Sequence, residues 1–316
     1  METDLMKWAF IVNPVAGNGY SLIVEKELIK QLEQRNIQAK LVRTEKHGHA
    51  SQLAEELAKE GFSHIVSLGG DGTLNEMARS LINYPKCTVG VVPAGTGNDF
   101  AQILGLPVHF EQEDWDTFFE AHSMATDVGR CNGNYFFNGM GLGFDAQVAS
   151  ENYTDSGELK PGIGKRIYIW HILKNLLFFR KQEMMLSMNG EKKQTVYFLN
   201  TIAIGRRFAG DFFLTPKAIA NDGLLDVCMV DKLNLYQRLS ILLKVPKGEH
   251  LSHPKVKYYQ TKKLSIEVEQ KAAYHLDGEL FFDTNFEIDI LPQKINFIYN
   301  PHRNHFFDLK GGATTK

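Results

Sequence analysis

The stretch SHIVSLGGDGTLNEMARS, residues 63–80, passes from a short apolar run through a glycine cluster into a helical pattern. Glycines let the backbone turn tightly and let a large ligand approach closely, and amides at the start of a helix commonly bind phosphate. Asp71 stands among these glycines. The loop by itself is compatible with two interpretations: Asp71 is a partner of Mg²⁺ beside a phosphate site, or it accepts hydrogen bonds from nearby amides in an ordinary turn.

Short apolar runs alternate with helical patterns throughout the first part of the chain. Leu53, Ala54, Leu57 and Ala58, for example, share one face of an expected helix over residues 50–60. Strand and helix alternating four times predict a parallel sheet with helices on its faces. The expected strands cover residues 7–12, 39–44, 64–69 and 88–92.

Three glycine-bearing loops follow these strands: NPVAGNG (13–19), GGDGTLNE (69–76) and PAGTGNDF (93–100). Ligands of such sheets bind beyond the carboxyl ends of the strands, so the fold would bring the loops to one edge. None is a Walker A motif, because no Gly-Lys-Ser/Thr follows the glycines. Thr96 and Asn98 are candidate ligands of phosphate or nucleotide, and Asp99 is a helix cap or a polar contact to substrate, with the cap favoured.

The pattern changes from about residue 126. Asn-Gly pairs at 132–133 and 189–190 lie between apolar runs and predict tight hairpins. Alternation with a period of two continues in KLSIEVEQ (263–270) and FEIDILPQKINFIY (286–299). The second part of the chain is therefore expected to be mostly antiparallel β structure.

Composition narrows the classes of function. The 35 basic and 37 acidic residues among 316 give a net charge of -2, so no general positive field attracts nucleic acid, and no nucleic-acid partner is expected. The three cysteines, Cys87, Cys131 and Cys228, have none of the spacings that bind zinc or build a disulfide framework. These features favour a reduced, cytoplasmic setting.

The loops together with three later segments resemble the bacterial diacylglycerol kinase family of lipid kinases, which is related to the sphingosine and ceramide kinases. The later segments are GLGFDAQVA (141–149), PKAIANDGLLDV (216–227) and HLDGEL (275–280). The resemblance also implies that Thr44, in VRTEKHGHA (42–50), lies near the nucleotide. The resemblance covers nearly the whole chain. It implies an NAD kinase/diacylglycerol kinase-like fold, with an α/β ATP-binding domain over residues 1–127 and a β-rich, sandwich-like lipid-substrate domain over residues 128–299. Residues 300–316 would pack back on the first domain.

The resemblance also implies roles for particular residues. Glu279, in the Asp-Gly-Glu signature, would be the general base, and Asp71 would organise Mg²⁺ at the catalytic site. Asp222, with the carbonyls of Ile219 and Leu224, would hold a second, structural magnesium. The ATP site would comprise Asn13, Pro14, Gly17, Thr44, Gly69, Gly70, Gly72, Thr73, Asn75, Glu76, Gly95, Thr96 and Asn98.

The expected reaction is transfer of phosphate from ATP to a lipid hydroxyl, with diacylglycerol as the substrate and phosphatidic acid as the product. A kinase for another lipid, a kinase for a soluble substrate such as NAD, and a catalytically idle regulator that binds nucleotide or lipid remain alternatives. GGDGT is similar to a motif of NAD kinases, but PAGTGNDFA and the Asp-Gly-Glu signature fit such enzymes poorly.

Residues 164–181 combine an apolar centre with flanking basic residues, as in helices that lie at a membrane interface. A core helix is the alternative. A lipid kinase must reach its substrate in a bilayer, so we expect transient, peripheral membrane contact, with this segment and Arg206, Arg207 and Phe208 near the lipid. Long strands such as that over 194–205 could also pair in a homodimer.

Overall fold

The computed structural model describes residues 6–151, 170–171, 174–175, 182–210 and 212–309. The chain divides into two compact units: unit 1 comprises residues 1–128, 219–222 and 292–316, and unit 2 comprises residues 129–218 and 223–291. The division after Val128 lies one residue from the expected boundary. Two segments expected in the second domain, 219–222 and 292–299, belong to unit 1.

Unit 1 is built on a parallel sheet with the order β4-β3-β1-β2. Its strands are β1 (Trp8–Val12), β2 (Ala39–Arg43), β3 (His64–Gly69) and β4 (Thr88–Pro93). The end of β13 (Glu279–Ile298) adds a parallel partner to β4 through Asn296 and Phe297. Every residue of β1 is buried, because helices cover both faces of the sheet, and such strands therefore read as continuous apolar runs.

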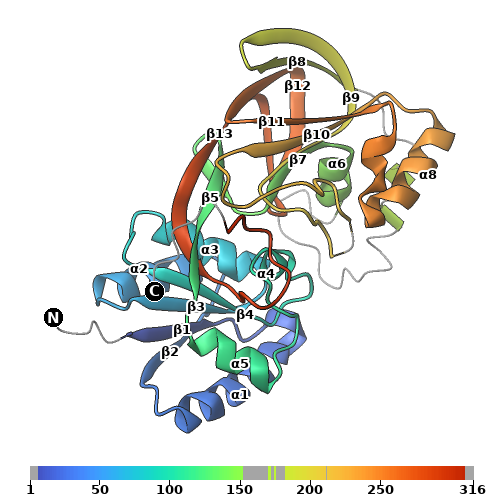
Figure 1. The fold of residues 1–316 in the computed structure, drawn as a ribbon. Coiled ribbons are helices and arrows are strands. Elements are labelled where there is room, and N and C mark those ends of the chain that lie inside the picture. Colours follow the sequence, from blue (N-terminus) through green and yellow to red (C-terminus); the bar gives the residue numbers. More distant parts are fainter. Residues whose placement is uncertain (1–5, 152–169, 172–173, 176–181, 211, 310–316) are drawn as a thin grey trace. The chain divides into compact units, whose positions relative to one another are not determined.

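Helices on the two faces of this sheet come from the segments between its strands (Figure 1). They are α1 (Tyr20–Gln34), α2 (His49–Lys59), α3 (Asp71–Leu81), α4 (Asp99–Ile103) and α5 (Gln112–Phe119), with a short 3₁₀ turn, η1 (Ala16–Gly19), before α1. Helices α1 and α5 share one face, where the rings of Trp8 and Phe119 meet edge to face with centroids 5.4 Å apart. Aromatic pairs of this kind add to the apolar burial that holds a helix on a sheet.

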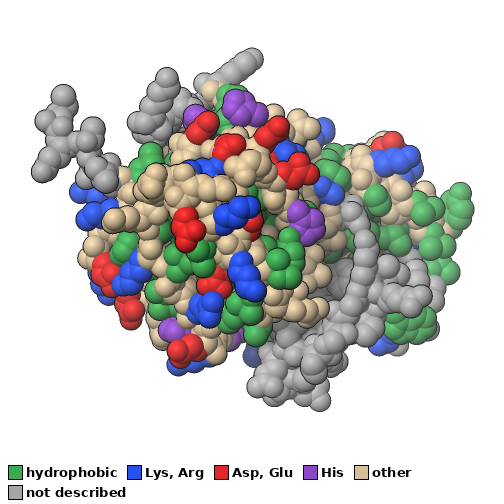
Figure 2. Space-filling view, turned by 90° about the horizontal axis from the view of Figure 1, so that it is seen from below, with side chains coloured by type: hydrophobic (Ala, Val, Ile, Leu, Met, Phe, Trp, Pro, Cys, Tyr) green, Lys and Arg blue, Asp and Glu red, His purple; other side chains and the backbone are tan. Residues whose placement is uncertain are grey.

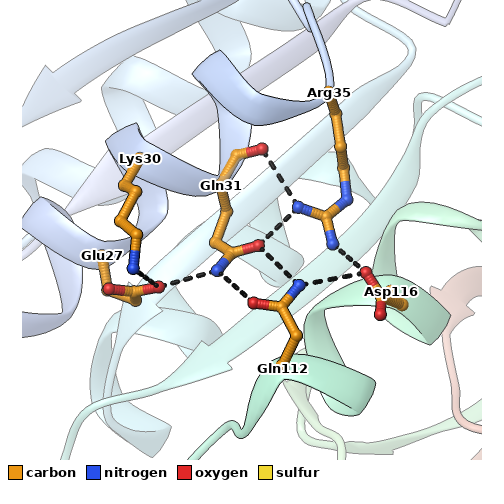
Figure 3. Close-up of polar contacts among 6 residues, drawn as sticks. All are labelled: Glu27, Lys30, Gln31, Arg35, Gln112 and Asp116. Carbon is orange, nitrogen blue, oxygen red and sulfur yellow. Dashed lines mark hydrogen bonds and ion pairs between the residues drawn. The ribbon is translucent and has the colours of Figure 1, made fainter.

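A polar network joins α1 to α5 in unit 1 (Figure 3). The side-chain amide of Gln31 donates to Gln112 Oε1 at 2.9 Å and to Glu27 Oε1 at 2.7 Å. Arg35 pairs with Asp116 and also donates to the Gln31 carbonyl at 3.1 Å. Gln31 is fully buried, so these bonds satisfy polar groups that would otherwise be costly to remove from water.

Unit 2 is mostly antiparallel, with the strand order β11-β10-β9-β7-β12-β13 and with β8 paired to β9 and β12. The strands not yet given are β5 (Ser123–Cys131, which begins in unit 1), β6 (Asn134–Phe136), β7 (Gly139–Gly143), β8 (Gln182–Met188), β9 (Glu191–Ala203), β10 (Leu225–Asp231), β11 (Val256–Thr261) and β12 (Lys263–Leu276). Its helices are α6 (Phe144–Ser150), α8 (Leu235–Lys244), η2 (Val245–Lys247) and η3 (Glu249–Ser252).

Both hairpins predicted from Asn-Gly pairs are present. Asn132 and Gly133 have φ of 49° and 85° between β5 and β6, and Asn189 and Gly190 have φ of 54° and 82° between β8 and β9. Two successive positive φ angles match the right-handed twist of the strands, which explains why this pair is favoured there. The expected fold class, an α/β domain followed by an antiparallel β-rich domain, is confirmed.

The expected interfacial segment, 164–181, lies outside the described residues except for 170–171 and 174–175. Among the helices of the described part of the chain, none combines the length and the apolar character that crossing a bilayer requires.

Candidate functional site

The three glycine-bearing loops of unit 1 are tied to one another at the carboxyl ends of β1, β3 and β4. Asn13 donates its backbone N–H to the Leu68 carbonyl at 3.0 Å and its side-chain amide to Thr73 Oγ1 at 2.9 Å. Ala94 donates its backbone N–H to the Gly69 carbonyl at 2.8 Å. The predicted convergence of the loops at one sheet edge therefore follows from direct contacts within unit 1.

Glycine is required where these loops meet. A Cβ on Gly95 would lie 2.4 Å from Gly70 Cα, and a Cβ on Gly17 would lie 2.4 Å from the Ala94 carbonyl oxygen. Gly17 also has a positive φ of 57°. Gly72 differs, because its Cβ would meet nothing within 4 Å and the residue is exposed. Two glycines thus allow the backbones to touch, whereas Gly72 lies beside open space at the start of α3.

Asp71 links the second loop to the third. It is the first residue of α3, and its carboxylate accepts hydrogen bonds from the backbone N–H groups of Asp99 and Phe100, each at 3.1 Å. These N–H groups lie at the start of α4 and have no partner within that helix. Burial raises the pKa of the Asp71 carboxyl above its usual range, and the backbone N–H groups of Phe100 and Asp99 oppose that rise. One role of Asp71 is therefore to cap α4 from a neighbouring loop.

The prediction that Asp99 caps its helix, α4, is wrong. Asp99 is the first helical residue of α4, and the N-cap position is Asn98, whose side chain makes no capping bond. The Asn98 amide instead accepts from the Gly95 N–H at 3.0 Å and donates to the Gly95 carbonyl at 2.9 Å, with φ of 55° at Asn98. Asn98 thereby holds the turn of the third loop, and the long-range carboxylate of Asp71 supplies the cap.

The other candidate ATP residues of unit 1 surround this edge. Thr96 is exposed on the third loop, Thr44 is buried after β2, and Asn75 is buried on α3 with no hydrogen-bond partner for Nδ2 among the described residues. Glu76 accepts from the Ala50 N–H at 3.2 Å, near the start of α2, and lies 3.3 Å from His47 Nδ1. Glu76 therefore connects α3 to α2.

Residues 219–222 are held within unit 1 by backbone bonds. The Ala220 carbonyl accepts from the Asp127 N–H at 2.9 Å, and the Ala220 N–H donates to the Phe306 carbonyl at 2.8 Å. Asn221 is buried and exchanges two hydrogen bonds with Asp308, at 2.8 and 3.0 Å. Of the expected metal ligands, Ile219 and Asp222 belong to unit 1 and Leu224 to unit 2.

In unit 2, Glu279 is the half-buried first residue of β13 and pairs with Leu276 across a tight hairpin. Asp277 and Gly278 form the turn, with φ of 49° and 91°. The Asp277 carboxylate accepts three backbone N–H groups, from Phe137 at 2.7 Å, Asn138 at 2.9 Å and Gly139 at 2.7 Å.

The Asp277 N–H in turn donates to the Gly139 carbonyl at 2.9 Å. The aspartate of the Asp-Gly-Glu signature is therefore the anchor that fixes the turn carrying Glu279. An aspartate followed by glycine in the sequence gives no signal of where its carboxylate will bond.

No group of three or more His, Cys, Asp or Glu side chains suited to a metal ion occurs within residues 6–151, 182–210 and 212–309 or the four described residues between 170 and 175. The expected magnesium ligands are of a different kind, because two of the three are backbone carbonyls.

Comparison with known proteins identifies the class. Residues 7–131 match the model of the diacylglycerol kinase catalytic domain, and residues 125–299 match that of the YegS C-terminal NAD kinase beta sandwich-like domain. Together with the loops above, these matches define a lipid kinase. The chain belongs to the bacterial diacylglycerol kinase family.

Individual relatives agree with this assignment. The chain is 30% identical to the diacylglycerol kinase of Bacillus subtilis (strain 168) over 278 residues, which cover 87% of this chain and 90% of that protein. It is 29% identical to the diacylglycerol kinase of Staphylococcus carnosus (strain TM300) over 270 residues, covering 85% and 87%. A crystal structure of a diacylglycerol kinase from Bacillus anthracis str. Sterne superimposes with a TM-score of 0.73 at 22% identity, covering 96% of this chain and all of that one (100%). The last comparison supports the fold.

Proposed function

We propose that this lipid kinase transfers the γ-phosphate of ATP to the hydroxyl of diacylglycerol, giving phosphatidic acid. The observation that carries the proposal is the joining of three glycine-bearing loops at the carboxyl ends of β1, β3 and β4, in a chain of the diacylglycerol kinase family. Membership of a kinase family implies ATP as the phosphate donor.

The nucleotide would bind along this edge of unit 1. Its phosphates would approach the start of α3, where the exposed Gly72 leaves space and the positive end of the helix dipole favours anions. Thr96, which is exposed on the third loop, could donate its hydroxyl to a phosphate. Asn13 and Thr73, bonded to each other, would fix the shape of the first two loops.

Magnesium would neutralise charge on the transferring phosphate when bound. A carboxylate has about four acceptor positions, so capping of α4 by Asp71 is compatible with contact to the ion or to water around it. For the structural magnesium, the exposed Asp222 carboxylate and the carbonyls of Ile219 and Leu224 are oxygen donors, which suit a hard cation.

Glu279 is the proposed general base. A lipid hydroxyl has a high pKa, so a carboxylate within hydrogen-bond reach must accept its proton as the new bond to phosphorus forms. Support for this role comes from the fixed hairpin: three backbone N–H groups hold Asp277, and Asp277 sets the turn from which Glu279 projects. A positioned carboxylate is more effective than a mobile one, because less ordering is needed in the transition state.

The test is a phosphorylation assay with a panel of lipids and NAD, read by mass spectrometry. We expect product from diacylglycerol with the unaltered protein and a loss of at least about a hundredfold in kcat for Glu279→Gln, since general-base catalysis contributes roughly 10²–10⁴. Glu269→Gln, an exposed carboxylate on β12 in the same unit, is the control and should retain full activity.

Nucleotide binding is measured in parallel for each variant. Robust transfer by Glu279→Gln would refute the base assignment. Phosphorylation of NAD but of no lipid would refute the substrate, and ATP binding without transfer to any acceptor would identify a regulator.

A further inference from the structure

Helix α8 of unit 2 carries an apolar stripe that faces solvent. Leu235, Tyr236, Leu239 and Leu243 are 48%, 81%, 44% and 78% exposed. At about 100° per residue, these four positions fall within an arc of about 100° on the helix surface. Figure 2 shows hydrophobic side chains gathered at the right-hand edge of the molecule, on the side where Figure 1 places α8.

A different face of the same helix attaches it to unit 2. Ile241, and Val245 directly after the helix, are buried in a cluster with Phe198 and Val230, and Leu242 packs against that cluster. The guanidinium of Arg238 lies 4.8 Å from the centre of the Phe198 ring. Because these contacts hold the helix, the exposed stripe is not needed to keep α8 folded on its unit. Contiguous apolar residues that face solvent commonly mark an interaction site, so this arc of four large apolar residues indicates a binding partner outside the described structure.

Lysines lie at both ends of α8. Lys232 precedes the helix, Lys244 ends it, and Lys247 follows in η2. Lys244 also lines a surface hollow of about 450 Å³ together with Lys217, Ser252 and Glu249. The Lys217 ammonium lies 5.8 Å from the centre of the Tyr258 ring. The hollow thus has two lysines against one glutamate.

An apolar arc flanked by lysines is the chemistry that binds an anionic lipid surface: leucines and a tyrosine enter the boundary of the acyl chains while the lysines meet phosphate groups. We infer that α8 and the adjoining hollow form the surface through which this protein docks on anionic bilayers. The inference rests on the proposed function in one respect, since a substrate within a bilayer requires such docking. It assigns docking to residues 232–252 together with Lys217.

Vesicle flotation tests the inference directly. Vesicles of phosphatidylcholine alone and of phosphatidylcholine with phosphatidylglycerol are mixed with the full chain, and the bound fraction is measured across a range of salt concentrations. We expect binding to the anionic vesicles that weakens with salt. Leu239→Ala/Leu243→Ala should weaken it at least tenfold, since burial of each leucine side chain contributes strongly and alanine preserves helix propensity.

Two further variants separate the contributions. Lys244→Glu/Lys247→Glu should reduce binding to anionic vesicles and remove most of the salt dependence. Ile23→Ser, on α1 of unit 1, replaces a side chain that is 64% exposed and should leave binding unchanged. Circular dichroism of each variant checks that the helices are retained.

The inference is overturned if the unaltered protein does not bind anionic vesicles, or if the double leucine variant binds within twofold of it. A change from dimer to monomer in that variant without lipid, with vesicle binding intact, would instead identify the stripe as a contact between two copies. Transfer to a dispersed short-chain diacylglycerol should be unaffected by the α8 variants. Failure of that reaction in the unaltered protein would refute the proposed function and leave the docking measurement valid.

Discussion

Replacing Asp277 by asparagine tests the anchor of the Asp-Gly-Glu turn. One carboxylate oxygen accepts the Phe137 N–H at 2.7 Å, and the other accepts those of Asn138 and Gly139 at 2.9 and 2.7 Å. Asparagine has only one acceptor oxygen, and its NH₂ group would take the place of the other carboxylate oxygen. At least one of the three backbone N–H groups would then face a second donor instead of an acceptor. Phe137 is fully buried, which limits replacement of that partner by water.

The expected cost follows from this geometry. A buried donor left without a partner costs about 1–3 kcal/mol, and bonds to a charged acceptor are worth about 1.5–3 kcal/mol. We therefore expect Asp277→Asn to lower the free energy of unfolding of unit 2 by about 2 kcal/mol, which corresponds to a roughly thirtyfold change in the opening equilibrium. If Glu279 is the base, kcat should fall as well, with little change in the affinity for ATP.

Hydrogen exchange is the most direct assay, because the amides of residues 137–139 report the local effect even if the two units unfold separately. Urea unfolding gives the global free energy. Glu269→Gln removes a carboxylate from the exposed surface of β12 and is expected to change stability by less than about 0.5 kcal/mol. Unchanged protection of the three amides in Asp277→Asn would refute the reasoning.

Two other predictions follow from unit 1. Gly95→Ala should destabilise this unit by about 1–3 kcal/mol and weaken ATP binding, because the new Cβ would lie 2.4 Å from Gly70 Cα. Gly72→Ala should leave the stability of the unit unchanged, because its Cβ would meet nothing within 4 Å. Equal urea midpoints for the two variants would contradict this reasoning. The His64 ring lies with its centroid 4.6 Å from that of Trp8, and burial lowers the pKa of His64 to about 4, so the unfolded chain binds a proton at higher pH than the folded one. The contribution of neutral His64 to the free energy of unfolding is complete above about pH 6.5 and is lost as the pH falls toward about 4. The loss at about pH 5, relative to high pH, is about 2 kcal/mol. His64→Phe should show a smaller loss than the unaltered protein in urea unfolding at about pH 7.5 and about pH 5, and parallel losses would exclude His64 as the cause.

Local patterns of apolar and turn-forming residues were enough to predict much of the fold. The apolar runs placed β1 to β4 within a residue of their observed bounds. For β1, β3 and β4 the reason is that a strand buried on both faces needs consecutive apolar residues. The Asn-Gly pairs placed two hairpins, because few residues adopt consecutive positive φ angles. The ordered glycine-rich segments also indicated the lipid kinase family, which the comparisons confirm.

Contacts between residues distant in the chain could not be predicted from the sequence. It offered two roles for Asp71 and favoured Asp99 as the cap of its helix, whereas the carboxylate of Asp71 reaches the N–H groups of residues 99 and 100 from another loop. It gave no sign that Asp277 would bond to residues 137–139, or that residues 219–222 would join unit 1.

Helix α8 shows the same limit in its apolar residues. Its sequence contains leucines and isoleucine on more than one face, and hydropathy cannot tell which face meets the core. In the structure, Ile241 and Val245 pack against Phe198, so their face meets the core and Leu239 stays exposed. The sequence by itself determined the elements, their order and the family, because local conformational preference and apolar period are properties of neighbouring residues. Only the tertiary structure decided which carboxylate caps which amides and which apolar face stays in water, because those outcomes depend on residues distant in the chain.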